Sequence, residues 1–314
     1  MSPLFGGVDC GGTKFLCVVG TSPDDIRASR VVKTETDPRI TMAGVAEFFR
    51  DCGHLDDIAA IGLASFGPLD LSPASPTYGG IRVTTKPGWD GFNQVAWLRE
   101  AFGEIPVGIQ TDVGGAAMAE ATWGQGRGCD SLCYITVGTG VGGAHISGGR
   151  LMNGHSHSEM GHMTMRRHPD HDYPGCCKYH GDCIEGLVSG PAIRDWTGTP
   201  GEALPPDHPA FDYVAHYLGQ MCANVFFSTS PERIVLGGGV MAKPGLIDRI
   251  RDSANAHLAG YLYWPTPDRI GQAITVSEWV RDGRPATAHP VNAGALGGLL
   301  VAREALERKE RGTP

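Results

Sequence analysis

The sequence predicts an α/β protein with two lobes and a ligand site between them. Residues 6–20 and 134–149 each read as a strand, a glycine-rich turn and a second strand. Such an approximate duplication is typical of folds that bind a ligand between the two copies. The rest of the chain alternates short apolar runs with segments of helical periodicity, which indicates α/β lobes.

The spacing of apolar residues predicts the individual helices and strands. Apolar residues recur at helical spacing in residues 45–52 and 211–225, and residues 293–309 read as an amphipathic helix with a charged tail. Short β-rich runs predict further strands at residues 59–64, 105–111, 233–236 and 273–277.

The boundary between the lobes is expected at Asp112. The small residues after this aspartate would let a helix begin close to another surface. Residues 1–112 are therefore assigned to a small N-terminal α/β lobe, completed by a C-terminal helix in residues 293–314. Residues 113–292 are assigned to a larger α/β lobe.

The composition is that of an ordinary globular protein and argues against a nucleic-acid partner. Of the 314 residues, 41% are hydrophobic and 19% charged, and the formal net charge is −8, without a sustained basic run. We expect neither a signal peptide nor a membrane span, since no run of about 18 apolar residues occurs. The nine cysteines are mostly scattered, which favours a reducing cytoplasm over a disulfide framework.

Three glycine clusters follow predicted strands, at residues 9–14, 138–143 and 237–241. Glycine lets several backbone N–H groups converge on a phosphate without a clash from Cβ atoms. Tight hairpin turns are the alternative interpretation for any single cluster, because an isolated glycine motif is weak evidence. Three clusters at strand ends, two of them duplicated, favour a nucleotide.

A Cys/His cluster predicts a structural zinc site on a loop spanning residues 162–183. Cys177, His180 and Cys183 form a Cys-x₂-His-x₂-Cys motif, and His162 can complete a tetrahedron. Four protein ligands without an open position describe a structural zinc. The alternative is a loop that merely carries reduced cysteines and histidines. Three nearby residues compete as ligands, and Cys176 in particular could replace Cys177; the other two are His168 and His171.

Asp112 is the candidate general base, because it ends a predicted strand ahead of a helix of small residues. A helix N-cap is the alternative role for an aspartate at that position. Glu159 and His162 would face the same way on a helical turn, and Glu185 follows Cys183 closely. Two carboxylates held by one metal loop suit hydrogen bonding to a polyol, although surface charge is the default for glutamate.

These segments together resemble the ROK family, named for repressor, open reading frame and kinase. The resemblance rests on residues 8–14, 138–143 and 159–162 and on the Cys/His loop, and it extends from residue 6 to about residue 302. It implies a two-lobed actin-like ATPase (ribonuclease H-like) fold with a ligand cleft between the lobes. It also implies transfer of the γ-phosphate of Mg-ATP to a sugar hydroxyl, and a homodimer.

The resemblance implies a role for each candidate site residue, with Asp112 as general base and Asp9 helping to hold Mg²⁺ through water. The residues implied for the sugar are Gly67, Thr111, Glu159, His162 and Glu185. The residues implied for the nucleotide are Gly11, Gly12, Thr13, Lys14, Thr139, Gly140, Pro191, Gly237, Gly238, Gly239 and Met241.

Within the family, the sequence is most similar to bacterial zinc-containing fructokinases. The similarity lies in the loop at residues 78–89, in the element Gln110-Thr-Asp112 and in the Cys-x₂-His-x₂-Cys spacing. Gly114 and Thr85 depart from the residues that are common there, asparagine and proline respectively. The resemblance implies phosphorylation of D-fructose to fructose 6-phosphate.

Three other functions remain as alternatives. A glucokinase, mannokinase or broad hexokinase would use the same scaffold. A sugar-sensing repressor would need an N-terminal helix-turn-helix of about 60 residues, for which the hairpin beginning at residue 6 leaves no expected room. A non-catalytic sugar-binding protein is disfavoured because Asp112, Lys14 and Thr139 are all present.

Overall fold

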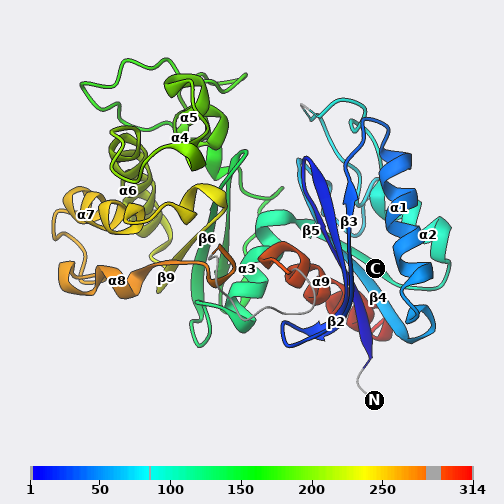
Figure 1. Cartoon of the computed structure of the whole chain (residues 1–314). Helices are drawn as coiled ribbons and strands as arrows, with labels where there is room; N and C mark the ends of the chain where they lie inside the picture. Colours follow the sequence, from blue (N-terminus) through cyan, green and yellow to red (C-terminus); the bar gives the residue numbers. More distant parts are fainter. Residues whose placement is uncertain (1–2, 85, 281–290, 313–314) are drawn as a thin grey trace. The chain divides into compact units, whose positions relative to one another are not determined.

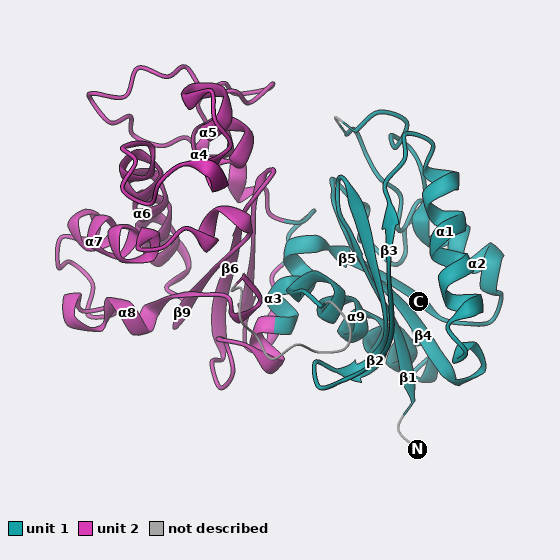
Figure 2. Ribbon diagram, in the orientation of Figure 1, with its two compact units in different colours: residues 1–119, 153–157, 283–314 teal, residues 120–152, 158–282 magenta. Residues whose placement is uncertain are grey.

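The computed structural model describes residues 3–84, 86–280 and 291–312 (Figure 1). The chain forms two compact units (Figure 2). Unit 1 contains residues 1–119, 153–157 and 283–314, and unit 2 contains residues 120–152 and 158–282. The division falls within helix α3 (Asp112–Trp123). Residues 1 and 314, the outer limits of the expected lobes, lie outside the described residues. The same holds for Thr85, the residue that stands where a proline is common in the fructokinases.

Unit 1 is built on a mixed five-stranded sheet of order β3-β2-β1-β4-β5. Helices α1 and α2 cover one face of this sheet, and α9 and the start of α3 cover the other (Figure 2). The elements not yet given are β1 (Leu4–Cys10), β2 (Lys14–Ser22), β3 (Asp25–Lys33), α1 (Pro38–Asp51), β4 (Ile58–Ser65), α2 (Gln94–Phe102), β5 (Val107–Thr111) and α9 (Ala293–Glu310).

Unit 2 is built on a second five-stranded sheet, of order β10-β9-β6-β7-β8. The apolar face of α6 packs into one core with β6 and β9, through residues such as Phe211, Leu218 and Leu236. The elements are β6 (Ser131–Val137), β7 (Val141–Ser147), β8 (Arg150–Leu151), α4 (Ile184–Val188), α5 (Gly190–Thr197), α6 (Ala210–Thr229), β9 (Arg233–Gly237), α7 (Leu246–Leu258), α8 (Ile270–Ala273) and β10 (Ile274–Val276).

The two sheets repeat one topology, which confirms the predicted duplication. In unit 1, β1 pairs antiparallel with β2 and parallel with β4, β2 pairs antiparallel with β3, and β4 pairs parallel with β5. In unit 2, β6 pairs in the same way with β7 and β9, β7 with β8, and β9 with β10. The glycine-rich turns at residues 11–13 and 138–140 therefore occupy equivalent positions in the two sheets.

The predicted helices and strands are present, with shifts at their ends. The helix predicted around residues 45–52 begins earlier, at Pro38, because Asp37 caps its first turn through Arg39 N. The strand expected from residue 105 begins at Val107. Pro106, which precedes it, lacks the N–H group that a sheet hydrogen bond needs. In the described ranges, which omit residues 1–2, 85, 281–290 and 313–314, no helix is long and apolar enough to span a membrane.

Helix α9 differs from the amphipathic helix that the sequence predicts. Its residues 293–302 are all buried, whereas residues from 303 onward are half-buried or exposed. Burial therefore changes along the helix axis instead of around it. The reason is a very close approach to the sheet: a Cβ atom added at Gly62 of β4 would lie 2.1 Å from Gly298 O and 2.3 Å from Ala302 N. In the same way, a Cβ atom added at Gly7 of β1 would lie 2.5 Å from Ala295 O.

We predict that Gly62→Ala lowers the stability of the protein by about 2 kcal/mol or more. The added methyl group would overlap backbone atoms of α9, which cannot move aside as a flexible side chain can, and overpacking of this kind typically costs about 1–3 kcal/mol. Thermal unfolding followed by circular dichroism measures the change. Gly154→Ala is the matched control, because a Cβ atom there meets nothing nearer than 4.0 Å. Equal melting temperatures for the two variants would contradict the close approach.

Candidate functional site

Three chain segments leave the sheet of unit 1 at the same edge. Cys10 of β1 pairs with Ser65 of β4, and Ser65 pairs with Thr111 of β5. The three strands are parallel where they pair, so their carboxyl ends lie side by side. The segments that follow them are the turn at residues 11–13, the Phe66-Gly67 segment and Asp112. The carboxyl edge of a parallel sheet is where α/β proteins usually bind ligands.

The turn between β1 and β2 presents Gly12 in an open position, whereas a Cβ atom at Gly11 would lie 2.8 Å from Lys14 O. Gly11 N donates to Lys14 O at 3.1 Å, which closes the turn. A Cβ atom added at Gly12 would meet only one atom within 4 Å, the Nζ of Lys86 at 3.8 Å. Gly12 and Thr13 are exposed, as is Lys14 at the start of β2. Such an open glycine turn beside an ammonium group is suited to an anionic ligand.

Asp9 lies one residue before the end of β1 and close to the N-terminus of α9. Its Oδ2 accepts a hydrogen bond from Asn292 Nδ2 at 2.7 Å, and Asn292 also caps α9 by accepting from Ala295 N at 2.8 Å. Burial raises the pKa of the Asp9 carboxyl, which the Asn292 hydrogen bond and the charge of Lys14 partly offset. A desolvated carboxylate at this edge is a fitting partner for a hard cation such as Mg²⁺.

Asp112 begins α3, but Thr111 provides the helix cap. Thr111 Oγ1 accepts from Gly114 N at 3.0 Å, the contact that an N-cap residue makes with the third residue of a helix. Asp112 Oδ1 accepts from the adjacent Val113 N at 2.8 Å. Gly114 also leaves no space for a side chain, since a Cβ atom would lie 2.7 Å from Gln110 Cγ. The capping alternative for Asp112 therefore loses its main support.

The small residues of α3 do allow the predicted close approach. A Cβ atom at Gly115 would lie 2.7 Å from Ala64 Cβ of β4, and one at Gly297 of α9 would lie 2.2 Å from Gly115 O. The first turn of α3 is therefore held against both β4 and α9. This packing fixes the direction in which the helix leaves the sheet edge at Asp112.

The second glycine turn lies at the matching edge of the sheet of unit 2. Gly138 N donates to Gly140 O at 2.8 Å and Gly138 O accepts from Gly190 N at 2.8 Å. Since Pro191 follows Gly190 in the first turn of α5, the structure brings Pro191 close to this turn. Thr139 at the tip is exposed.

Glu185 contacts the same turn. Its Oε2 accepts from Val141 N at 3.0 Å and would lie 2.7 Å from a Cβ atom at Gly140. The sequence analysis expected Glu185 beside the Cys/His loop and in contact with the sugar, and did not anticipate this hydrogen bond. The bond holds the start of α4 against the second glycine turn.

The third glycine cluster follows β9. Gly238 has a φ of +87°, and a Cβ atom added there would lie 2.3 Å from Val137 O. A Cβ atom at Gly237 would lie 2.1 Å from the Tyr134 hydroxyl, whereas Gly239 has open space around it. Met241 is 4% exposed and belongs to the core of unit 2. Its predicted contact with a nucleotide stays a prediction.

The four predicted metal ligands come together in a geometry that could hold a metal ion. One ligand atom from each of His162, Cys177, His180 and Cys183 lies within 4.8 Å of all the others. The His162 Nδ1 atom is 3.5 Å from Cys183 Sγ and 3.8 Å from Cys177 Sγ. Tetrahedral zinc with Zn–N of about 2.0 Å and Zn–S of about 2.3 Å has ligand edges of about 3.3–3.8 Å. The printed distances from His162 Nδ1 fall in this range, and the four residues form a candidate metal site with donor types that zinc prefers.

Backbone hydrogen bonds build this cluster. Cys177 N donates to Gly181 O at 3.1 Å and Gly181 N to Cys177 O at 2.9 Å, a tight turn that brings His180 back over Cys177. Ile184 N donates to Met163 O at 3.0 Å, which places Cys183 beside His162.

The competing ligands lie elsewhere. Cys176 is exposed and does not belong to the cluster of ligand atoms. His171 bonds to Tyr217 through Nδ1 at 2.9 Å and stacks on Tyr213, and His168 packs edge-on against Tyr213. The described residues thus favour Cys177 over Cys176 as a ligand.

Glu159 and His162 lie on the predicted helical turn. Residues Met160–His162 form a 3₁₀ turn, in which His162 N donates to Glu159 O at 3.0 Å. Glu159 is the N-cap of this turn, with φ of −119° and ψ of 52°, so its expected alignment with His162 stays a prediction. Glu159 is exposed.

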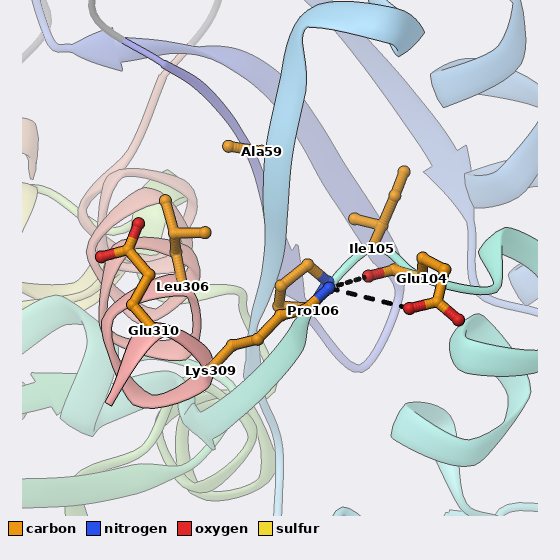
Figure 3. Close-up of a pocket in the computed structure, with 7 residues that line it drawn as sticks. All are labelled: Ala59, Glu104, Ile105, Pro106, Leu306, Lys309 and Glu310. Carbon is orange, nitrogen blue, oxygen red and sulfur yellow. Dashed lines mark hydrogen bonds and ion pairs between the residues drawn. The ribbon is translucent and has the colours of Figure 1, made fainter. Parts of the chain in front are cut away.

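A pocket away from these residues lies near the C-terminal end of α9 (Figure 3). It has a volume of about 470 Å³, and Lys309 of α9 reaches the backbone carbonyl of Glu104 at 2.7 Å beside it. Its lining residues are Ala59, Glu104, Ile105, Pro106, Leu306, Lys309 and Glu310. None of the predicted site residues is among them.

Three residues near the predicted site were not predicted from the sequence. Asn292 bonds to Asp9, Lys86 reaches Gly12, and His157 lies against Gly67 while accepting from Leu69 N at 3.0 Å. Only Asn292 carried a usable signal, because an asparagine before a helical run is a typical N-cap. The contacts of the other two join segments remote in sequence.

Comparison with known proteins places the chain in a family. The profile of the ROK family matches residues 5–273. A fructokinase of Pediococcus pentosaceus is 36% identical over 97% of this chain and 99% of its own length. A fructokinase of Zymomonas mobilis subsp. mobilis is 42% identical over 82% of this chain and 88% of its own length.

A solved structure shares the architecture. The crystal structure of a ROK hexokinase from Thermus thermophilus matches with a TM-score of 0.75 and 28% identity, covering 98% of this chain and 99% of that one. The α/β fold with two equivalent mixed sheets is thus the actin-like ATPase fold of ROK sugar kinases, as the resemblance implied. The chain belongs to the ROK family.

Proposed function

We propose that this protein is an ATP-dependent fructokinase that converts D-fructose to fructose 6-phosphate. The fructokinases among its relatives, similar over most of both chains, support the substrate. One structural observation carries the site assignment: the glycine turn at residues 11–13, Gly67 and Asp112 follow three strands that end at one sheet edge. A phosphate-binding turn, a sugar segment and a carboxylate would then meet where ligands of such sheets bind.

In this proposal Asp112 is the general base. Its carboxylate accepts the proton of the primary hydroxyl at C6 as that oxygen attacks the γ-phosphorus of ATP. The new O–P bond forms in line with the breaking bond to the β-phosphate oxygen, and ADP leaves. Positioning and charge neutralisation supply most of the catalysis in such transfers. The placement of Asp112 at the start of a tightly packed helix supports this role, because its backbone is held by β4 and α9.

The remaining site residues are assigned by type. The glycine turn at residues 11–13 with Lys14 contacts phosphates, as do Thr139 and Gly140. Pro191 and the segment at residues 237–241 contact the rest of the nucleotide. Gly67, Thr111, Glu159, His162 and Glu185 contact the sugar. Asp9 would hold Mg²⁺ through water, and the bound ion would neutralise phosphate charge. The cytoplasmic location and the homodimer remain proposals that rest on the family.

The test of the function is a panel of hexoses assayed with Mg-ATP. We expect ADP release with fructose at a kcat/KM at least about tenfold above that for mannose, glucose or N-acetylmannosamine, because one misplaced hydroxyl typically costs more than 1.4 kcal/mol. Product identity by NMR should show phosphate at C6. A higher kcat/KM for glucose or mannose would replace fructose as the substrate. Nucleotide binding without phosphorylation of any sugar would favour a non-catalytic protein.

Asp112→Asn should lower kcat by at least about 10²-fold with only a modest change in the KM for fructose. The amide keeps the size of the side chain but cannot accept the proton, and general-base catalysis contributes about 10²–10⁴-fold. Steady-state kinetics measures the change. Asp56→Asn is the control, since Asp56 is exposed on a distant turn. Full activity of Asp112→Asn would remove this residue from the role of base.

We expect about one zinc per chain, held by His162, Cys177, His180 and Cys183. Cys183→Ser should lower the zinc content, increase hydrogen exchange across residues 160–190 and raise the KM for fructose, because the metal closes a loop that is otherwise entropically unfavourable. Elemental analysis measures the metal. Cys176→Ser serves as the matched control, since its side chain lies outside the cluster. Protein purified without chelator that holds no zinc would refute the site.

A further inference from the structure

Lys86 lies at the tip of the first glycine turn although it is 74 residues away in sequence. Its Nζ donates a hydrogen bond to the carbonyl oxygen of Gly12. The same Nζ lies 5.7 Å from the centroid of the Phe66 ring. The ammonium group is therefore close both to the turn assigned to the nucleotide and to the residue that precedes Gly67.

A buried tryptophan holds Lys86 in this place. Trp89 is fully buried, and its Nε1 donates to Glu35 O at 2.9 Å. Its ring lies 5.5 Å from that of Phe15 and 5.2 Å from that of Phe66, measured between centroids. Trp89 N also donates to Lys86 O at 3.3 Å, so a turn of the backbone connects Lys86 to the buried tryptophan. Phe15 and Phe66 adjoin Lys14 and Gly67, so one aromatic cluster fixes the turn, the sugar segment and Lys86 together.

The charge of Lys86 is not balanced within the part of the chain that the structure describes. Its contacts there are the Gly12 carbonyl and the face of Phe66, and no carboxylate pairs with it. Partial burial lowers the pKa of its ammonium group. Lys33 of β3, the strand that pairs with β2, by contrast forms an ion pair with Glu35 at 2.9 Å. A partly buried cation without a carboxylate partner is suited to a ligand that supplies the negative charge.

We propose that Lys86 is a further catalytic residue, whose ammonium group contacts the γ-phosphoryl group of ATP as it passes to the sugar. The inference rests on the proposed function. The group in transfer must lie between nucleotide and sugar, and Lys86 lies next to the segments assigned to each. Lys14, at the start of β2, would then contact the other phosphates of ATP. A second cation would stabilise the charge that spreads over the phosphoryl oxygens in the transition state.

Nucleotide affinity distinguishes a contact with the γ-phosphate from a structural role. Isothermal titration of Lys86→Met with the Mg²⁺ complex of AMPPNP, an ATP analogue that is not hydrolysed, should give about tenfold weaker binding or more. The affinity for Mg-ADP should stay within about twofold, because ADP lacks the group that Lys86 contacts. In the coupled assay kcat should fall at least about 10²-fold, as for other preorganised donors. Lys86→Arg should restore part of both losses.

Lys33→Met is the matched control, because it removes the same charge from the strand beside the turn and should change neither affinity. Equal weakening of ADP and AMPPNP binding by Lys86→Met would show that Lys86 only holds the loop, and would overturn the inference. Unchanged AMPPNP binding would overturn it as well. Should Lys86→Met melt at a lower temperature, Lys86→Gln is titrated in its place. Wild-type protein that binds neither nucleotide would reject the proposed function itself.

Discussion

The parallel pairing of β1, β4 and β5 is the constraint on which the site of unit 1 depends. Its register aligns Cys10, Ser65 and Thr111, so that three remote segments leave the sheet at one edge. The backbone of α9 lies directly on two of these strands, at Gly7 of β1 and Gly62 of β4. A packing contact that only glycine allows therefore supports the strands that carry these three segments.

The same arrangement connects stability with electrostatics. The N-terminus of α9 points its cap residue, Asn292, at Asp9, so the helix that covers the sheet also orients a carboxylate at the sheet edge. Trp89 likewise positions a cation: it is buried against Phe15 and Phe66, and this packing places the Lys86 ammonium group beside Gly12 of the first glycine turn. Apolar burial thus positions an anion and a cation that would otherwise favour solvent.

Local patterns in the sequence predicted the repeated elements well. Glycine turns between β-rich runs, the small residues after Asp112 and the Cys-x₂-His-x₂-Cys spacing are signals contained within a few residues. What could not be predicted depends on tertiary contacts. The pairing of Asp9 with Asn292 spans 283 residues, and periodicity could not show that α9 is buried at one end instead of along one side. The bond from Val141 N to Glu185 likewise depends on how α4 packs on a turn.

The central claim is that phosphate and sugar meet at the carboxyl edge of the sheet of unit 1. Amide hydrogen exchange measured by mass spectrometry, with and without ligands, tests it directly. Mg-AMPPNP should slow exchange in peptides covering residues 11–14, and fructose should slow it in peptides covering residues 66–69. Exchange that is unchanged in both segments, under conditions where calorimetry shows both ligands bound, would contradict the account.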